Sequence, residues 1–82
     1  MIRAFMFLNV EPGSEANVLK HLKTLEAVEE AYVSYGVYDI IIRVRAETAE
    51  KMKDVVTRQV RSINQVSSTL TLMMVEEQTS RT

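Results

Sequence analysis

The 82-residue chain repeats one order of patterns, in which a strand-like alternation of apolar residues precedes a helix-like stripe and a second strand-like run. The expected elements are a strand at 2–10, a helix from 14 to about 26, a strand at 28–35, a strand at 38–46, a helix at 48–63 and a strand at 66–77. Two such halves in one sheet, with both helices on the same side, form the ferredoxin-like βαββαβ fold. Because crossover connections are right-handed, few other arrangements remain. We therefore predict an α+β domain with a four-stranded antiparallel sheet.

Each expected helix has a capping residue and an apolar stripe. Ser14 and Thr48 are residue types that favour the N-cap position. The stripes are Val18, Leu19, Leu22 and Leu25 in the first helix, and Ala49, Met52, Val55, Val56, Val60 and Ile63 in the second. Gln59 also falls on the second stripe. Its side chain could reach an edge of the domain, donate a hydrogen bond across a dimer, or remain as a polar defect in the core, and the sequence does not choose among these.

Apolar residues occupy both faces of the expected sheet. Alternation assigns Ala4, Met6, Leu8, Ala31, Val33, Ile40, Ile42, Val44, Leu70, Leu72 and Met74 to the helix-covered face. It assigns Phe5, Phe7, Tyr32, Ile41, Met73 and Val75 to the opposite face, together with the polar residues Ser34, Arg43, Thr69 and Thr71. Both helices already cover the first face, and an exposed apolar patch of this kind marks an interface. We expect two copies to pair sheet to sheet into a dimeric α/β barrel, with Phe5, Phe7, Tyr32, Ile41 and Met73 in the interface.

The composition excludes several classes of protein. Apolar residues make up 46% of the chain, which favours a regular globular fold over disorder. Ten basic and eleven acidic residues with no block of like charge predict no binding to DNA or to membranes. The absence of cysteine excludes disulfides and thiolate metal sites. We expect a cytoplasmic protein with no cofactor, one domain at 1–77 and a polar tail at 78–82.

Two features that could carry chemistry are better explained without it. The only histidine, His21, has no visible partner for catalysis or metal binding, so we expect a solvated helix position. The run from Phe5 to Val10 resembles the first-strand signature of RNA recognition motifs, whose aromatic residues stack on bases. The companion basic-Gly-aromatic run is missing from 38–43, and the basic footprint is absent too. Packing in an interface is therefore the better account of the two phenylalanines.

Two stretches of the chain have distinctive sequence patterns. The first runs from Tyr32 to Val44 and contains a small or polar residue, then Gly-x-Tyr-Asp, then an apolar strand: Ser34, Gly36, Tyr38, Asp39 and the isoleucines that follow. The second runs from Val66 to Val75 and contains Val-x-x-Thr-x-Thr. Together they resemble the effector-binding and oligomerisation domain of the Lrp/AsnC (feast/famine) transcriptional regulators. The chain has no helix-turn-helix domain before its first strand, so it resembles a stand-alone version of the domain.

The resemblance implies a binding site for an amino acid or related effector, in a crevice where dimers meet. It places Gly36, Tyr38 and Asp39 of the hairpin at this site, with Ser34 beside them and Ser68 and Thr69 as weaker candidates. Asp39 has two open interpretations: its carboxylate accepts hydrogen bonds from the ligand's ammonium group, or it bonds to the amides of its own turn. Cross-strand pairing of hydroxyls is an adequate alternative account of Ser68 and Thr69.

The resemblance also implies a homodimer and the assembly of dimers into a higher oligomer. Any effect on transcription would run through assembly with a full-length regulator of the family. Two other classes remain open. One is a small cofactor-independent enzyme of the dimeric α/β-barrel type, for which Tyr32 or Asn9 could be nominated. The other is a purely structural assembly protein that has lost its ligand site.

Overall fold

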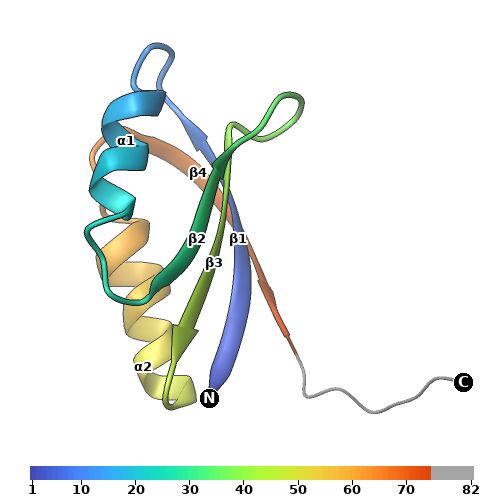
Figure 1. Ribbon diagram of the computed structural model, residues 1–82, viewed down its shortest axis with the longest axis vertical. Helices are drawn as coiled ribbons and strands as arrows, with labels where there is room; N and C mark the ends of the chain where they lie inside the picture. Colours follow the sequence, from blue (N-terminus) through green and yellow to red (C-terminus); the bar gives the residue numbers. More distant parts are fainter. Residues whose placement is uncertain (75–82) are drawn as a thin grey trace, which may run out of the picture.

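The computed structural model describes residues 1–74 and consists of a sheet with helices on one side (Figure 1). The elements are β1 (Ile2–Val10), α1 (Glu15–Leu22), β2 (Val28–Val33), β3 (Ile40–Ala46), α2 (Ala49–Asp54), the π-helical segment η1 (Val55–Val60) and β4 (Val66–Met73). The first helix and the middle strands are shorter than the sequence indicated. The expected tail at 78–82, the end of the last strand at residue 77 and Val75 lie outside the described residues.

The strand order is β2-β3-β1-β4, and every neighbouring pair is antiparallel. In Figure 1 both helices lie on the left of the sheet, and none of the elements within residues 1–74 lies over the opposite face. This arrangement confirms the predicted ferredoxin-like fold. We call the side of the sheet that the helices leave uncovered the open face.

The core lies between the helices and the two central strands. Its most deeply buried residues are Ala4, Met6, Leu8, Val18, Leu22, Ile40, Ile42, Val44, Met52 and Val60. The pairs Met6–Ile42 and Leu8–Ile40 lie directly opposite each other across β1 and β3. Strict alternation along these two strands therefore gave the correct buried face, because every second residue of a strand points the same way.

The faces of β4 differ from the prediction. Thr69, Thr71 and Met73 lie opposite Leu8, Met6 and Ala4, which places them on the helix side. Leu70 and Leu72 lie opposite Phe7 and Phe5, which places them on the open face. A register shift between Asn9 and Val10 is the cause, because Val10 pairs with Val66 while Asn9 pairs with Ser68. The extra residue on β4 forms a β-bulge. Each residue after the bulge therefore points to the opposite face from the one that alternation starting at Val66 predicts.

The second helix changes its winding after Asp54. The N–H of Arg61 donates to the carbonyl of Val56, five residues earlier, at 3.0 Å, as a π-helix requires. The wider turn brings Val60 fully into the core. Gln59 is turned to the rim, where its amide donates to Asp54 at 3.2 Å. This answers the question about Gln59, which reaches an edge and leaves no polar defect in the core.

The two expected caps behave differently. The hydroxyl of Thr48 accepts a hydrogen bond from the N–H of Lys51 at 3.1 Å, as an N-cap does. Ser14 occupies the N-cap position of α1 but makes no side-chain cap bond. Its buried hydroxyl instead donates to the carbonyl of Glu11 at 2.6 Å. Ser14 therefore tightens the turn that precedes α1.

Candidate functional site: the open face of the sheet

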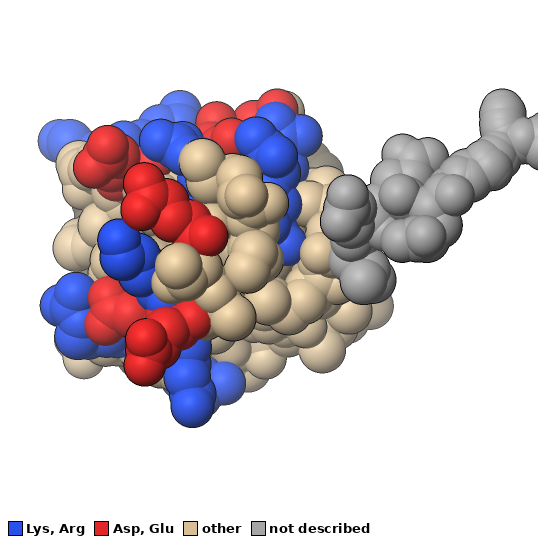
Figure 2. Space-filling view, turned by 90° about the horizontal axis from the view of Figure 1, so that it is seen from below, with Lys and Arg blue, Asp and Glu red and all other residues tan. Residues whose placement is uncertain are grey.

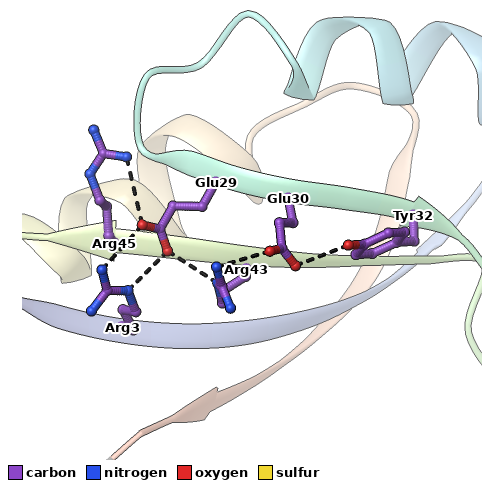
Figure 3. Close-up of polar contacts among 6 residues, drawn as sticks. All are labelled: Arg3, Glu29, Glu30, Tyr32, Arg43 and Arg45. Atoms are coloured by element: carbon purple, nitrogen blue, oxygen red, sulfur yellow. Dashed lines mark hydrogen bonds and ion pairs between the residues drawn. The ribbon is translucent and has the colours of Figure 1, made fainter.

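The open face divides along the strands into three zones. A polar row lies beside the β2–β3 hairpin, at the top of Figure 1, and contains Asn9, Asp39 and Ser68. An apolar middle follows, formed by Phe5, Phe7, Ile41, Leu70 and Leu72. A charged network lies toward the opposite end and contains Arg3, Glu29, Glu30, Tyr32, Arg43 and Arg45 (Figure 3).

Asp39 links the hairpin to β1 through both its backbone and its side chain. Its N–H donates to the carbonyl of Leu8 at 2.9 Å, and its Oδ2 accepts from the N–H of Val10 at 2.9 Å. Its carbonyl also accepts from the N–H of Ser34 at 2.8 Å, which closes the hairpin. The Asp39 carboxylate is thus bonded to the neighbouring strand, which neither interpretation from the sequence included.

Asn9 is the member of the polar row that sequence reasoning did not place at the ligand site. It lies between Leu8 and Val10, the two residues to which Asp39 bonds. Its side-chain amide donates to the Ser68 hydroxyl at 3.2 Å. Asp39, directly before β3, therefore lies in one row with Asn9 on β1 and Ser68 on β4. The sequence contained a signal for this, because the polar Asn9 interrupts the apolar character of its strand just before the chain turns.

Thr69 and Met73 are not brought to the open face. Thr69 lies opposite Leu8 and Met73 lies opposite Ala4, both on the helix side of the sheet. The register shift described above separates Ser68 from Thr69, so only Ser68 joins the polar row. The prediction that Met73 belongs to the open face is wrong, and Leu70 and Leu72 take its place beside the phenylalanines.

The hairpin presents exposed side chains above the polar row. Gly36 has a φ of +126°, in a region that side chains with a Cβ rarely adopt. The residues on either side of it, Tyr35 and Val37, are 96% and 81% exposed. The Tyr38 ring instead lies against the Phe7 ring, with centroids 5.6 Å apart and planes tilted by 57°. Tyr38 therefore joins the hairpin to the apolar middle.

The charged network is built around one glutamate. Arg3 and Arg45 lie directly opposite each other on β1 and β3, a like-charge pair that is unfavourable alone. Glu29, at a register shift in β2, accepts from Arg3 at 3.0 Å and from Arg43 at 3.1 Å, and lies 3.9 Å from Arg45. The hydrogen bond from Arg3 holds the pKa of the Glu29 carboxyl below its ordinary value, although partial desolvation opposes this. Figure 3 shows the three guanidinium groups converging on this carboxylate.

Glu30 extends the network along β2. Its carboxylate accepts from Arg43 at 2.9 Å and from the Tyr32 hydroxyl at 3.0 Å. The bond to Glu30 raises the pKa of the Tyr32 phenol. Tyr32 reaches the open face as predicted. Sequence reasoning missed the network, although the odd-numbered arginines of β1 and β3 were a signal for charge on this face.

Little else in the described chain suggests a catalytic or metal centre. Within residues 1–74 no group of three or more His, Asp or Glu side chains is placed to hold a metal ion. No helix in that range is long and apolar enough to cross a membrane. Tyr32 and Asn9, nominated for an enzymatic role, bond to Glu30 and Ser68 on the uncovered sheet face. The polar row therefore remains the best-formed candidate site.

The comparisons with known proteins agree on one family. The sequence profile described as the Lrp/AsnC ligand binding domain matches residues 3–82. The regulatory protein AsnC of Escherichia coli K12 is 30% identical over 66 residues, which cover 80% of this chain and 43% of AsnC. The chain spans about half the length of the curated relatives it matches.

Solved structures have the same architecture. The crystal structure of FFRP-DM1 has a TM-score of 0.89 and 31% sequence identity, and the match covers 92% of this chain and 100% of that one. The complex of the transcriptional regulator NMB0573 of Neisseria meningitidis with L-Met has a TM-score of 0.80. At 13% identity, with 93% of this chain and 51% of that one covered, it shows a common fold only. The profile match and the fold together show that the chain belongs to the Lrp/AsnC ligand-binding domain family.

Proposed function

We propose that this domain binds an amino acid or a closely related small molecule at the polar row and works as an oligomeric regulatory module. The observation that carries the proposal is the row itself. The Asn9 amide donates to the Ser68 hydroxyl, and the Asp39 carboxylate bonds to the N–H of Val10, the residue after Asn9, next to a hairpin whose glycine has a positive φ. Family membership supports the regulatory role, since relatives such as AsnC are regulatory proteins.

The ligand class follows from the groups in the row. Oδ2 of Asp39 is used by Val10 N–H, and a carboxylate has further lone pairs that can accept from an ammonium group. The Asn9 amide and the Ser68 hydroxyl can donate to a carboxylate. The L-Met complex of NMB0573 is an example of an amino acid bound by a protein of this fold. These groups favour a ligand with an amino group beside a carboxylate.

A second copy of the chain would cover the apolar middle. Leu70 and Leu72 are 44% and 50% exposed, and the two phenylalanines opposite them are only partly buried. Each large apolar side chain that leaves water contributes about 1.5–3 kcal/mol. We infer that two open faces pair, with the apolar middle at the centre and the hairpins at the rim. The exposed Tyr35 and Val37 then lie where dimers can meet, and this crevice would complete the ligand site.

Regulation of transcription would follow from assembly with other members of the family. The curated relatives are about twice as long as the matched region. A full-length regulator whose ligand-binding domain presents the same open face could pair with this chain. The effector would then change the stability of the mixed assembly.

Thermal unfolding in the presence of each of the twenty amino acids tests the binding proposal. A ligand that binds only the folded state stabilises it by about 2.7 kcal/mol at a hundredfold excess over its dissociation constant. We expect one or a few amino acids to raise the melting temperature. Asn9→Ala should remove that rise, whereas the matched Asn64→Ala, at an exposed asparagine outside the row, should keep it. No shift with any amino acid would refute the proposal.

A further inference from the structure

We propose that the cleft at the lower end of the molecule is a second binding site, separate from the polar row, for a small zwitterion. The cleft has a volume of about 480 Å³ and lies between the N-terminus, the α1–β2 connection, the end of β3 and the second helix. This volume is within the usual range of small-molecule sites. Figure 2 views the molecule from this end and shows acidic and basic side chains interspersed over the left and upper part of the view, with uncharged residues over the rest.

The first observation is the change of winding beside the cleft. Val55 and Gln59 both line the cleft, and both belong to the π-helical segment η1. π-Helical turns are rare and are often found at functional sites. The wider turn presents Gln59 at the rim, where Asp54 accepts a bond from its amide nitrogen. The amide oxygen of Gln59 is then available to a donor on a ligand.

The second observation is the state of the charged groups in the lining. Arg45 lines the cleft. Its guanidinium forms an ion pair with Glu29 at 3.9 Å, which is longer than a hydrogen bond, and Glu29 already accepts hydrogen bonds from Arg3 and Arg43. The N–H donors of Arg45 can therefore bind a carboxylate as a fork. Glu26, in the connection after α1, lines the same cleft. Within residues 1–74 it forms no ion pair, so its carboxylate can accept from an ammonium group.

The third observation is the character of the remaining surface. Val55 and Ala46 are buried and form an apolar floor. Lys51 is paired with Glu47, and Asp54 is paired with Arg58, so these charges are largely balanced before a ligand enters. A ligand of single charge would leave either the N–H donors of Arg45 or the carboxylate of Glu26 without a hydrogen bond from the ligand. A molecule with one carboxylate, one ammonium group and a short apolar body matches all three features.

NMR spectroscopy of the full chain tests this site separately from the polar row. The backbone amides of Asp54, Val55 and Gln59 report on the cleft, and those of Asn9 and Gly36 report on the row. The probes are the twenty amino acids at millimolar concentration, followed by the deaminated and decarboxylated analogues of whichever one shifts the cleft amides most. We expect saturable shifts at the cleft with that amino acid, and binding at least tenfold weaker with either analogue.

Two variants and a control decide the outcome. Glu26→Gln should weaken binding at the cleft about ten- to a hundredfold, because one charge-assisted bond is lost. Gln59→Met, which keeps the length of the side chain, should weaken it while the chain stays folded by circular dichroism. The control Glu11→Gln removes an exposed carboxylate elsewhere and should change nothing. Shifts confined to Asn9 and Gly36, or equal affinity in Glu26→Gln, would overturn the proposal. Shifts confined to the cleft would support it and would count against the row.

Discussion

The two faces of one sheet differ in what occupies them and in how completely they are buried. On the helix side the middle of each central strand presents aliphatic residues and one methionine with no exposed surface, such as Ile40 and Ile42. On the open face the same strands present aromatic rings, arginines and Asn9, all partly exposed. Ile41 and Ile42 are neighbours in β3 yet belong to these different environments. The comparison indicates that one face stabilises the folded chain and the other serves association and binding.

The largest effect should come from the covered face. Ile42→Ala removes a side chain that is completely buried between sheet and helices, and such a truncation costs about 2–5 kcal/mol in the free energy of unfolding. Ile41→Ala is the matched control on the open face, and we expect it to change association more than the stability of the protomer. Urea denaturation at several protein concentrations measures both quantities. Equal, concentration-independent losses in the two variants would mean that the faces do not differ in this way.

The next effect concerns association through the open face. Phe7 pairs with Ile41 and Leu70 in the apolar middle and contacts the Tyr38 ring. Phe7→Glu would place an unpaired charge at the centre of the proposed interface, which costs about 3–5 kcal/mol when the charge is buried. We expect the wild type to be at least a dimer by light scattering, and the variant to be a folded monomer by the same measurement and by circular dichroism. A wild-type monomer at micromolar concentration would remove the dimer proposal.

The difference between the faces also explains which parts of the fold could be predicted. The alternation along β1 and β3 is unbroken over their length, so their buried residues followed directly from it. The faces of β4 were reversed because Ser67, Ser68 and Thr69 are small and polar, and nothing in their order marks a bulge. Periodicity alone cannot locate a register shift among residues that tolerate either face.

The second helix gives a similar lesson. A regular period of 3.6 residues places both Val60 and Gln59 on the apolar stripe, whereas in the π-helical segment Val60 alone is fully buried and Gln59 lies at the rim. For the same reason, only part of the candidate site could be predicted from the sequence. Asp39 and Ser68 reach the polar row, but Asn9 and the network around Glu29 depend on cross-strand neighbours that become known only with the register.

A smaller effect, on ligand affinity, is expected at the polar row of the open face. Asp39→Asn keeps an oxygen that can accept from the N–H of Val10 while it removes the negative charge. If Asp39 binds the ammonium group of a ligand, affinity should fall by about 1.5–3 kcal/mol, or roughly ten- to a hundredfold. Calorimetry with the amino acid that gives the largest thermal shift measures this. Unchanged affinity with intact assembly would leave Asp39 as a link between strands only.

The smallest effect is expected from the charged network and concerns acid stability. The hydrogen bond from Arg3 lowers the pKa of Glu29 from its ordinary value of 4.5 in the folded chain. A lowered pKa in the folded state means that the unfolded state binds the proton more readily. The stabilisation by Glu29 is therefore fully present above pH 4.5 and is lost as the pH falls through the lower folded value. Glu29→Gln should flatten the acid limb of the curve of stability against pH. The effect should shrink in high salt because the network is close to solvent.

The control Glu50→Gln alters an exposed carboxylate outside the network and should keep the acid limb. Parallel acid limbs for wild type and Glu29→Gln, measured by urea denaturation across pH, would show that the network contributes nothing to folding. Its arginines would then be explained by association alone.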